Sequence, residues 1–158
     1  MHRRFHCIFV AYFGEKRSSI HQSHRTIAPL QAWAQTHLMN QDTKQLTDAI
    51  RAGIEEKKGS HITIVDLTDI PEAVCQAFVI CTGGSPTQVH ALAESVEDVL
   101  TKRGLGKPSA IVGMQNAQWV AMDYGSVMVH IFLPEMRDFY DLEHLWADGV
   151  IEEIKDES

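Results

Sequence analysis

One segment constrains the fold more than any other part of the chain. An almost wholly apolar run at residues 77–82 leads directly into Gly83-Gly84-Ser85-Pro86. Such a run is typical of a central strand that is buried on both faces of a sheet. Ser85 is a favoured helix N-cap, Pro86 suits the first helical position, and Gln88 completes a capping box. The segment therefore predicts a buried strand, a tight turn and a capped helix.

The helix that starts here has clear periodicity and a clear end. Its buried stripe is expected to consist of four residues at helical spacing: Val89, Leu92, Val96 and Leu100. Gly104 follows Lys102 and Arg103, which is a typical helix C-terminus. Residues 110–112 predict the next strand. A strand, a helix and another strand in succession form a βαβ unit, which places the chain in the α/β class.

The segment before this unit predicts one helix and one strand. Asp42 and Gln45 form a plausible capping box, and Gly59 marks the end of the helix. Between them, apolar residues recur at helical spacing at Leu46, Ala49, Ile50, Gly53 and Ile54. Residues 61–67 are rich in β-branched side chains and predict a strand.

The segment after the unit predicts a hairpin and short helices. Residues 119–123 and 127–133 are apolar runs joined by Tyr124-Gly125, which favours a tight turn. Neither face of the second run is clearly polar, so helices must cover one face and helices, a second copy or a partner the other. Residues 134–146 predict one or two short helices. The expected fold is a single α/β domain with an about five-stranded mixed sheet and flanking helices.

Composition divides the chain into a leader (1–38), a domain (39–147) and an acidic tail (148–158). The leader holds five basic residues, one acid and five of the nine histidines, without sustained periodicity. It loosely resembles a signal peptide, although its apolar run is short, and an organellar transit peptide also fits. We favour a third interpretation, in which translation begins at Met39, because periodic sequence starts just after this residue.

Net charge indicates the kind of partner. Residues 39–158 hold nine basic and twenty acidic side chains, a net charge of −11. A domain this acidic is repelled by phosphate backbones, which disfavours direct nucleic-acid binding and favours a basic protein partner or a merely solubilising surface.

Apolar runs stay well below the roughly 20 residues of a membrane span. Three cysteines, at 7, 75 and 81, form no Cys-x-x-Cys pair, which disfavours a disulfide framework and a zinc site.

The residues that could support catalysis form no recognisable set. The Gly83-Gly84-Ser85 turn could bind phosphate through backbone N–H groups, as in a nucleotidyltransferase-like site. However, the following strand has no carboxylate for a metal, and the Gly-Lys-Ser/Thr ending of a Walker loop is missing. His130 alternates with apolar residues and is expected to be a hydrogen-bonded core residue. The residues themselves therefore favour a binding protein, with no catalytic residue, cofactor or metal.

Five sequence blocks in order resemble the ribosomal silencing factor family, also called Iojap. They are Phe78-Val79-Ile80-Cys81-Thr82-Gly83-Gly84-Ser85, Gln88-Val89-His90-Ala91-Leu92-Ala93, Trp119-Val120-Ala121-Met122-Asp123-Tyr124-Gly125, Val129-His130-Ile131-Phe132 and Phe139-Tyr140-Asp141-Leu142-Glu143-His144-Leu145-Trp146. The resemblance covers residues 43–147 and implies a nucleotidyltransferase-like fold that lacks the catalytic carboxylates. It also implies a non-enzymatic cytoplasmic protein that is a homodimer when free.

The resemblance further implies a partner and a mechanism. Family members bind the fourteenth protein of the large ribosomal subunit, block association with the small subunit and repress translation under nutrient limitation. An acidic protein would be steered to a basic ribosomal protein. The alternative function is a nucleotide-binding or nucleotidyltransferase-like enzyme that uses the Gly83-Gly84-Ser85 turn.

The candidate partner-binding residues lie on the predicted hairpin. Trp119, Val120, Met122 and Tyr124 offer the aromatic and aliphatic anchors typical of interface hot spots, and Asp123 could pair with a basic residue. The alternative for Trp119 and Tyr124 is a place in the core. Four other large side chains are expected to be core or dimer contacts instead: Phe139, Tyr140, Leu145 and Trp146.

Overall fold

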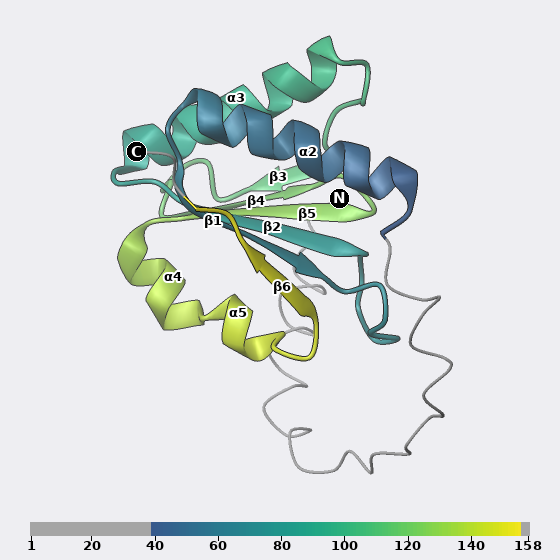
Figure 1. The fold of residues 1–158 in the computed structure, drawn as a ribbon. Helices are drawn as coiled ribbons and strands as arrows, with labels where there is room; N and C mark the ends of the chain where they lie inside the picture. Colours follow the sequence, from purple (N-terminus) through teal and green to yellow (C-terminus); the bar gives the residue numbers. More distant parts are fainter. Residues whose placement is uncertain (1–38, 156–158) are drawn as a thin grey trace, which may run out of the picture. The chain divides into compact units, whose positions relative to one another are not determined.

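The structure, a computed structural model, describes residues 39–155. The expectations for the leader, residues 1–38, lie outside the described residues, as does the end of the predicted acidic tail. The described part is one mixed α/β domain in which helices lie on both faces of a sheet (Figure 1). This confirms the predicted fold class.

The sheet has six strands instead of about five, in the order β3-β4-β5-β2-β1-β6. The strands are β1 (Ser60–Asp66), β2 (Ala77–Thr82), β3 (Ala110–Val112), β4 (Trp119–Asp123), β5 (Val127–Phe132) and β6 (Val150–Glu153). β2 and β5 are parallel, and every other neighbouring pair is antiparallel. The parallel neighbour of β2 is therefore β5, while β3, the strand directly after the helix, lies at the edge of the sheet.

The sixth strand falls in the segment predicted from composition to be an acidic tail. β6 pairs antiparallel with β1, with Thr63 opposite Glu153 and Asp66 opposite Val150. All four of its residues are exposed, so the segment has no buried face and no hydrophobic alternation that would predict a strand. Its pairing depends on the open edge of β1, which is a tertiary feature.

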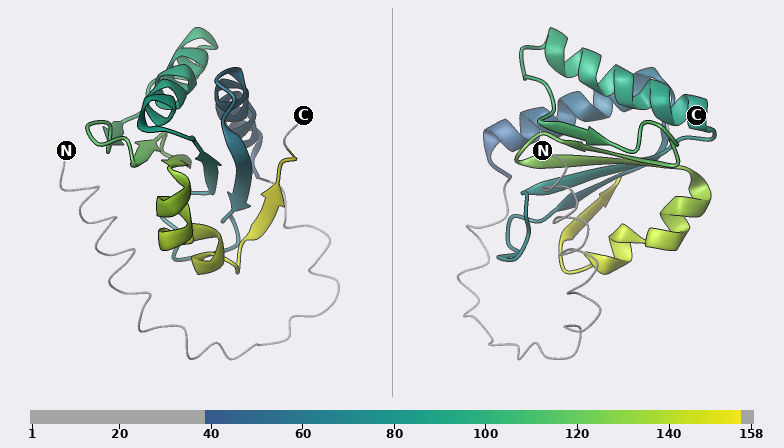
Figure 2. Two further views of the ribbon diagram at one scale, coloured as in Figure 1. Left: turned by 90° about the vertical axis from the view of Figure 1, so that its left-hand side faces the viewer. Right: turned by 180° about the vertical axis from the view of Figure 1, so that it is seen from behind.

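Two long helices, α2 (Gln41–Glu56) and α3 (Pro86–Lys102), cover one face of the sheet (Figures 1 and 2). They pack closely because Gly53 has no side chain: a Cβ there would lie 2.8 Å from the Cα of Val96. Ser85 caps α3 as predicted, with its hydroxyl accepting from the Gln88 amide. The N-cap of α2 is Asn40 and not Asp42, since the Asn40 side chain accepts from the Thr43 amide over 2.7 Å.

Two short helices, α4 (Pro134–Tyr140) and α5 (Leu142–Leu145), lie against the opposite face of the sheet, which we call the second face (Figure 2). Asp141, with a φ of 45°, separates them by a left-handed turn. α4 has no buried residue. Leu142 and Trp146, in α5 and directly after it, are buried, and Trp146 contacts Phe78 of β2. The predicted short helices are thus confirmed, and they supply the cover that this face requires.

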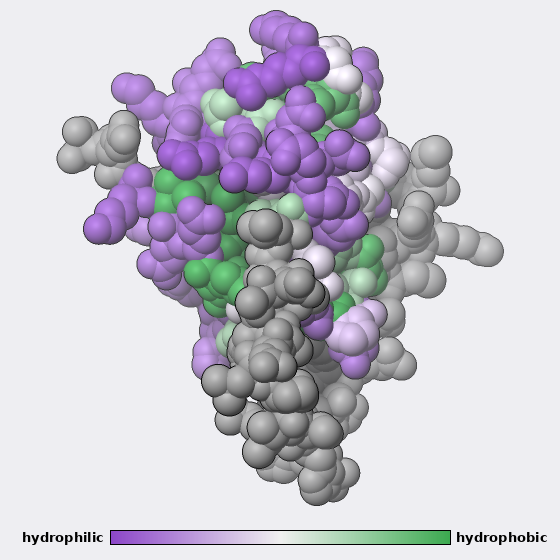
Figure 3. All heavy atoms as spheres, turned by 45° about the vertical axis from the view of Figure 1, so that its right-hand side comes forward, coloured by the Kyte–Doolittle hydropathy of each residue, from purple (hydrophilic) through white to green (hydrophobic). Residues whose placement is uncertain are grey.

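Hydrophilic side chains dominate the described surface in the view of Figure 3, with hydrophobic residues in separate patches. Within residues 39–155, no helix combines the length and the apolar character needed to cross a membrane. Four large hydrophobic side chains are exposed in the described residues: Val74, Phe139, Val150 and Ile151.

Candidate partner-binding surface

The five predicted partner-binding residues lie on β4 and the turn that follows it, but they do not share one face. Successive residues of a strand point to opposite sides of the sheet. Val120 and Met122 are completely buried in the core beneath α2 and α3, so neither presents a surface to a partner in this structure. Trp119 and Asp123 lie on the second face. The alternation therefore divides the predicted set.

Tyr124 also lies on the side of the sheet covered by α2 and α3, because it packs against the core on that side. Its hydroxyl is buried and has no hydrogen-bond partner among the described residues. Burial, and to a lesser degree the charge of Glu97, raises the pKa of the Tyr124 phenol above its ordinary value. Tyr124 is thus a partly buried packing residue.

Asp123 stabilises the hairpin turn. Only 7% of the residue is exposed, and one carboxylate oxygen accepts from the Gly125 amide over 2.8 Å. Its backbone carbonyl accepts from the amide and the hydroxyl of Ser109, which ties β3 to β4. Asp123 lies opposite Met128 in the ladder, whereas Trp119 lies opposite Phe132. The two residues are therefore at opposite ends of β4.

Trp119 is partly exposed and belongs to an aromatic cluster on the second face. Its indole stacks on Phe132 with ring centroids 5.0 Å apart, and the ring of Tyr140 lies 4.5 Å away. The indole Nε1 donates a hydrogen bond to Nδ1 of His130 over 3.1 Å. Phe78 contacts His130 edge to face, with centroids 4.9 Å apart. Contacts with Phe132, Tyr140 and His130 thus fix the position of the indole.

His130 is buried, with an exposed fraction of 5%, which confirms the predicted core histidine. Burial lowers the pKa of its imidazole to about 3. The ring is therefore neutral at physiological pH, and its Nδ1 remains an acceptor for the Trp119 indole. Because Nδ1 accepts, the proton of the neutral ring lies on Nε2, which has no hydrogen-bond partner among the described residues.

Helix α4 extends the cluster to the surface. Phe139 is 77% exposed, and its ring contacts that of Tyr140 edge to face at 5.1 Å. Phe139 was expected to be a core or dimer residue, and the structure shows that it is not in the core. The seven-residue helix α4 has no buried position, so this ring remains exposed. Trp119, Tyr140 and Phe139 together form what we call the aromatic surface.

Acidic side chains border this surface. Exposed carboxylates on α4 and at its end belong to Glu135, Asp138 and Asp141. Arg137 is the basic residue of the same helix, but its guanidinium is paired with Glu143. The surface therefore combines partly or fully exposed aromatic rings with neighbouring exposed carboxylates, which suits a basic partner.

The Gly83-Gly84-Ser85 turn serves a structural purpose in this protein. The Gly84 amide donates to the Gln88 side-chain oxygen over 2.7 Å, and the Gln88 amide donates to the Ser85 hydroxyl. The Gln88 side-chain nitrogen in turn donates to the carbonyls of Lys57 and Lys58, at the end of α2. The Gly84 and Gln88 amides are thus used in the cap of α3, and the Gln88 side chain joins α3 to the end of α2.

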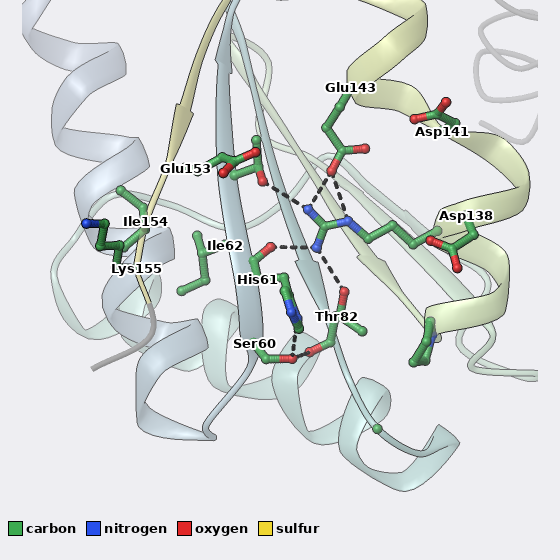
Figure 4. Close-up of a pocket in the computed structure, with 14 residues that line it drawn as sticks. Ser60, His61, Ile62, Thr82, Asp138, Asp141, Glu143, Glu153, Ile154 and Lys155 are labelled. Carbon is green, nitrogen blue, oxygen red and sulfur yellow. Dashed lines mark hydrogen bonds and ion pairs between the residues drawn. The ribbon is translucent and has the colours of Figure 1, made fainter. Parts of the chain in front are cut away.

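A pocket of about 750 Å³ opens beside this turn, between the ends of β1 and β2 and helix α4 (Figure 4). One of its lining residues is Arg137, whose guanidinium donates to protein oxygens. In residues 39–155 no cluster of three or more His, Cys, Asp or Glu side chains is placed to hold a metal.

Burial raises the pKa of the Cys75 and Cys81 thiols to about 12, so both remain unreactive thiols at neutral pH.

Comparison with known proteins decides the family. The model of the family described as "Ribosomal silencing factor during starvation" matches residues 40–158. The chain belongs to the ribosomal silencing factor family. This confirms the resemblance that the five sequence blocks carry.

The chain matches a bacterial relative over almost all of that protein and two eukaryotic relatives over about a third of theirs. The ribosomal silencing factor RsfS of Bacillus subtilis is 33% identical over 116 residues, which cover 73% of this chain and 95% of the relative. The chloroplastic protein Iojap of Zea mays is 33% identical over 78 residues, 46% of this chain and 31% of Iojap. The mouse mitochondrial assembly of ribosomal large subunit protein 1 is 34% identical over 72 residues, 44% of this chain and 32% of the mouse protein.

Two solved structures share the fold. A protein from Chromobacterium violaceum is 34% identical with a TM-score of 0.62, and the match covers 66% of this chain and 85% of that protein. A protein from Bacillus halodurans is 28% identical with a TM-score of 0.59, covering 71% of this chain and 98% of that protein. The silencing factor fold is thus the fold of residues 39–155.

Proposed function

We propose that this silencing factor binds the large ribosomal subunit through its fourteenth protein, blocks association with the small subunit and so represses translation under nutrient limitation. The observation that carries the proposal is the aromatic surface of Trp119, Tyr140 and Phe139 on the second face of the sheet. Aromatic anchors that are held rigidly and surrounded by polar groups are typical of binding hot spots.

Charge supports a ribosomal protein as the partner. Proteins that sit on ribosomal RNA are basic, whereas residues 39–158 carry a net charge of −11. Complementary charge accelerates the encounter with the ribosomal protein and keeps the silencing factor away from the phosphate backbone around it. The family relationship to a mouse protein named for assembly of the mitochondrial large subunit points to the same subunit.

Of the five predicted partner-binding residues, we therefore propose only Trp119 as a direct contact. Tyr140 and Phe139 join it as proposed contact residues. Val120 and Met122 contribute by supporting β4 from the core, and Asp123 and Tyr124 by stabilising the hairpin. Outside the ribosome, we propose a cytoplasmic homodimer, as the family resemblance implies. Sedimentation equilibrium of the purified protein tests the dimer, since a monomer at all concentrations would contradict it.

Co-sedimentation with purified large subunits tests the proposal. The full-length protein should travel with the subunit, and Trp119→Ala should weaken binding by at least about tenfold, the effect of losing one hot spot. Val74→Ala is the matched control, because Val74 is another exposed hydrophobic residue, in the loop between β1 and β2. Equal binding by folded Trp119→Ala and wild type would contradict the assigned surface.

The named partner needs a separate experiment. Titration calorimetry with the isolated fourteenth protein of the large subunit should give heat that Trp119→Ala reduces and added salt weakens, because rim charges are screened. Binding to the subunit without binding to this protein would retain the ribosomal role and contradict the named partner.

A further inference from the structure

Helix α4 lies against the second face although none of its residues is fully buried, so burial of apolar side chains alone does not account for its position. The Arg137 side chain, 14% exposed, comes from α4 and lines the pocket of Figure 4. Its Nε donates to a Glu143 carboxylate oxygen over 2.9 Å, and the same oxygen accepts from Nη2. This pair joins α4 to α5.

The rest of the guanidinium reaches the sheet. Nη1 donates to the Thr82 hydroxyl on β2 over 2.8 Å and to the backbone carbonyl of His61 on β1. Nη2 donates to the Thr63 hydroxyl on β1 over 2.9 Å. These contacts use all five N–H groups of an arginine. Every acceptor lies outside α4, so the guanidinium is a connector and not an open site for an anion.

The other attachment of α4 is aromatic. Tyr140 follows Arg137 by three residues, so both side chains emerge from neighbouring positions on one side of the helix. Tyr140 contacts Trp119 on β4 and Phe132 on β5. Arg137 thus binds α4 to β1 and β2, while Tyr140 meets the strands on the other side of β2.

We propose that Arg137 is a positioning residue for the large-subunit-binding surface. It fixes α4 on the sheet, which holds Tyr140 against Trp119 and places Phe139 beside them. The inference rests on the proposed function for its binding consequence, but the effect on α4 is independent of any partner. A lysine at this position would retain the charge without the planar fork, and its point charge could not reach β1, β2 and α5 together.

Two measurements on the full-length protein test this role: amide hydrogen exchange and affinity for large subunits. Arg137→Lys should speed exchange in residues 134–146 by at least about tenfold, since local opening loses several charge-assisted hydrogen bonds. Exchange in β2 and β5 should stay unchanged. Affinity for the large subunit should fall by about tenfold, because ordering α4 must then accompany binding.

Control variants separate positioning from stability. Val96→Ala removes buried volume on the opposite side of the sheet, so it should lower global stability and leave the affinity unchanged. Glu143→Gln keeps an oxygen acceptor for Arg137 and should bind within about threefold of wild type, whereas Glu143→Leu should match Arg137→Lys.

Each outcome decides a different statement. Unchanged exchange in α4 of Arg137→Lys, or faster exchange with unchanged affinity, would overturn the positioning role. An affinity that follows global stability equally in Arg137→Lys and Val96→Ala would also overturn it. Failure of the wild-type protein to bind large subunits would instead overturn the proposed function and the binding role of Arg137 with it, while the exchange data would still report whether Arg137 fixes α4.

Discussion

Nε1 of Trp119 donates its hydrogen bond to Nδ1 of His130, 3.1 Å away and inside the protein. This donor is therefore used internally, and the indole presents its ring and not its N–H to the surface. His130 thus leaves Trp119 without a free hydrogen-bond donor for a partner. A partner would meet Trp119 through apolar or cation–π contacts, and both suit the lysine and arginine side chains of a basic protein.

Replacement of His130 should release the indole without unfolding the protein. His130→Leu removes the acceptor but also a buried Nε2–H, so the free energy of unfolding at pH 7 should change by no more than about 1 kcal/mol. In a proton–nitrogen correlation spectrum, the Trp119 indole proton should shift upfield. His130→Asn places an oxygen near the Nδ1 position and should keep the shift of the wild type.

The indole signal is assigned by its loss in Trp119→Phe. Identical indole shifts in wild type and His130→Leu would contradict the hydrogen bond. An upfield shift of the same size in His130→Asn would show that the shift reports the loss of the ring and not of the acceptor.

The pH dependence of stability should carry the signature of buried His130. Its pKa is 6.5 in the unfolded chain and about 3 in the folded protein, where burial lowers it. Between these values the unfolded state binds the extra proton, so the contribution of His130 to the free energy of unfolding falls as the pH falls. From pH 7 to pH 5 the loss should be about 2 kcal/mol.

Urea denaturation of wild type and His130→Leu at both pH values measures this loss. Other titrating groups contribute to both proteins, so the difference between them isolates His130. The variant should gain stability relative to wild type as the pH falls. Parallel pH curves for the two proteins would contradict the assigned burial.

Gly113 should tolerate no side chain, because its backbone approaches that of Trp119. Its φ is +89°, and a Cβ would lie 1.9 Å from the Trp119 carbonyl oxygen. Gly113→Ala should therefore lower the free energy of unfolding by more than about 3 kcal/mol. Gly104→Ala is the control: its φ is +70°, nothing lies within 4 Å, and it should cost only about 1 kcal/mol. Equal losses by chemical denaturation would refute the close approach.

Phe139 should matter for binding and hardly at all for stability. Phe139→Ser removes a ring that is 77% exposed, so the free energy of unfolding should change by less than about 0.5 kcal/mol. Affinity for the large subunit should nevertheless fall about tenfold if the ring is an anchor. Val74→Ser, at 49% exposure in the loop before β2, should leave the affinity unchanged. Equal affinities of Phe139→Ser and wild type for the large subunit would show that Phe139 is not a binding anchor.

Local sequence signals predicted the elements whose chemistry is local. Ser85 and Pro86 mark the start of α3 because an N-cap needs only its own neighbours. The hairpin of β4 and β5 follows in the same way from its apolar runs and its turn. The predicted N-cap of α2, Asp42, was wrong: Asn40 is the cap, and its side chain also donates to Gln76, a contact across the fold that local sequence does not reveal.

The surface depended on tertiary contacts and was only partly predictable. Trp119 stands out as an anchor in sequence, but strand alternation sends Val120 and Met122 into the core. Arg137 carried no signal besides being a single basic residue among acids, because its acceptors lie on β1, β2 and α5. Phe139 resembled a core residue until the length and exposure of α4 were known.

Subunit joining tests the central claim most directly. Large subunits are first incubated with the full-length protein, small subunits are then added, and the particles are separated on a density gradient. The account predicts that the protein travels with the large subunit, that intact ribosomes fail to form, and that Trp119→Ala restores joining. Normal formation of intact ribosomes while the wild-type protein stays bound to the large subunit would contradict the account.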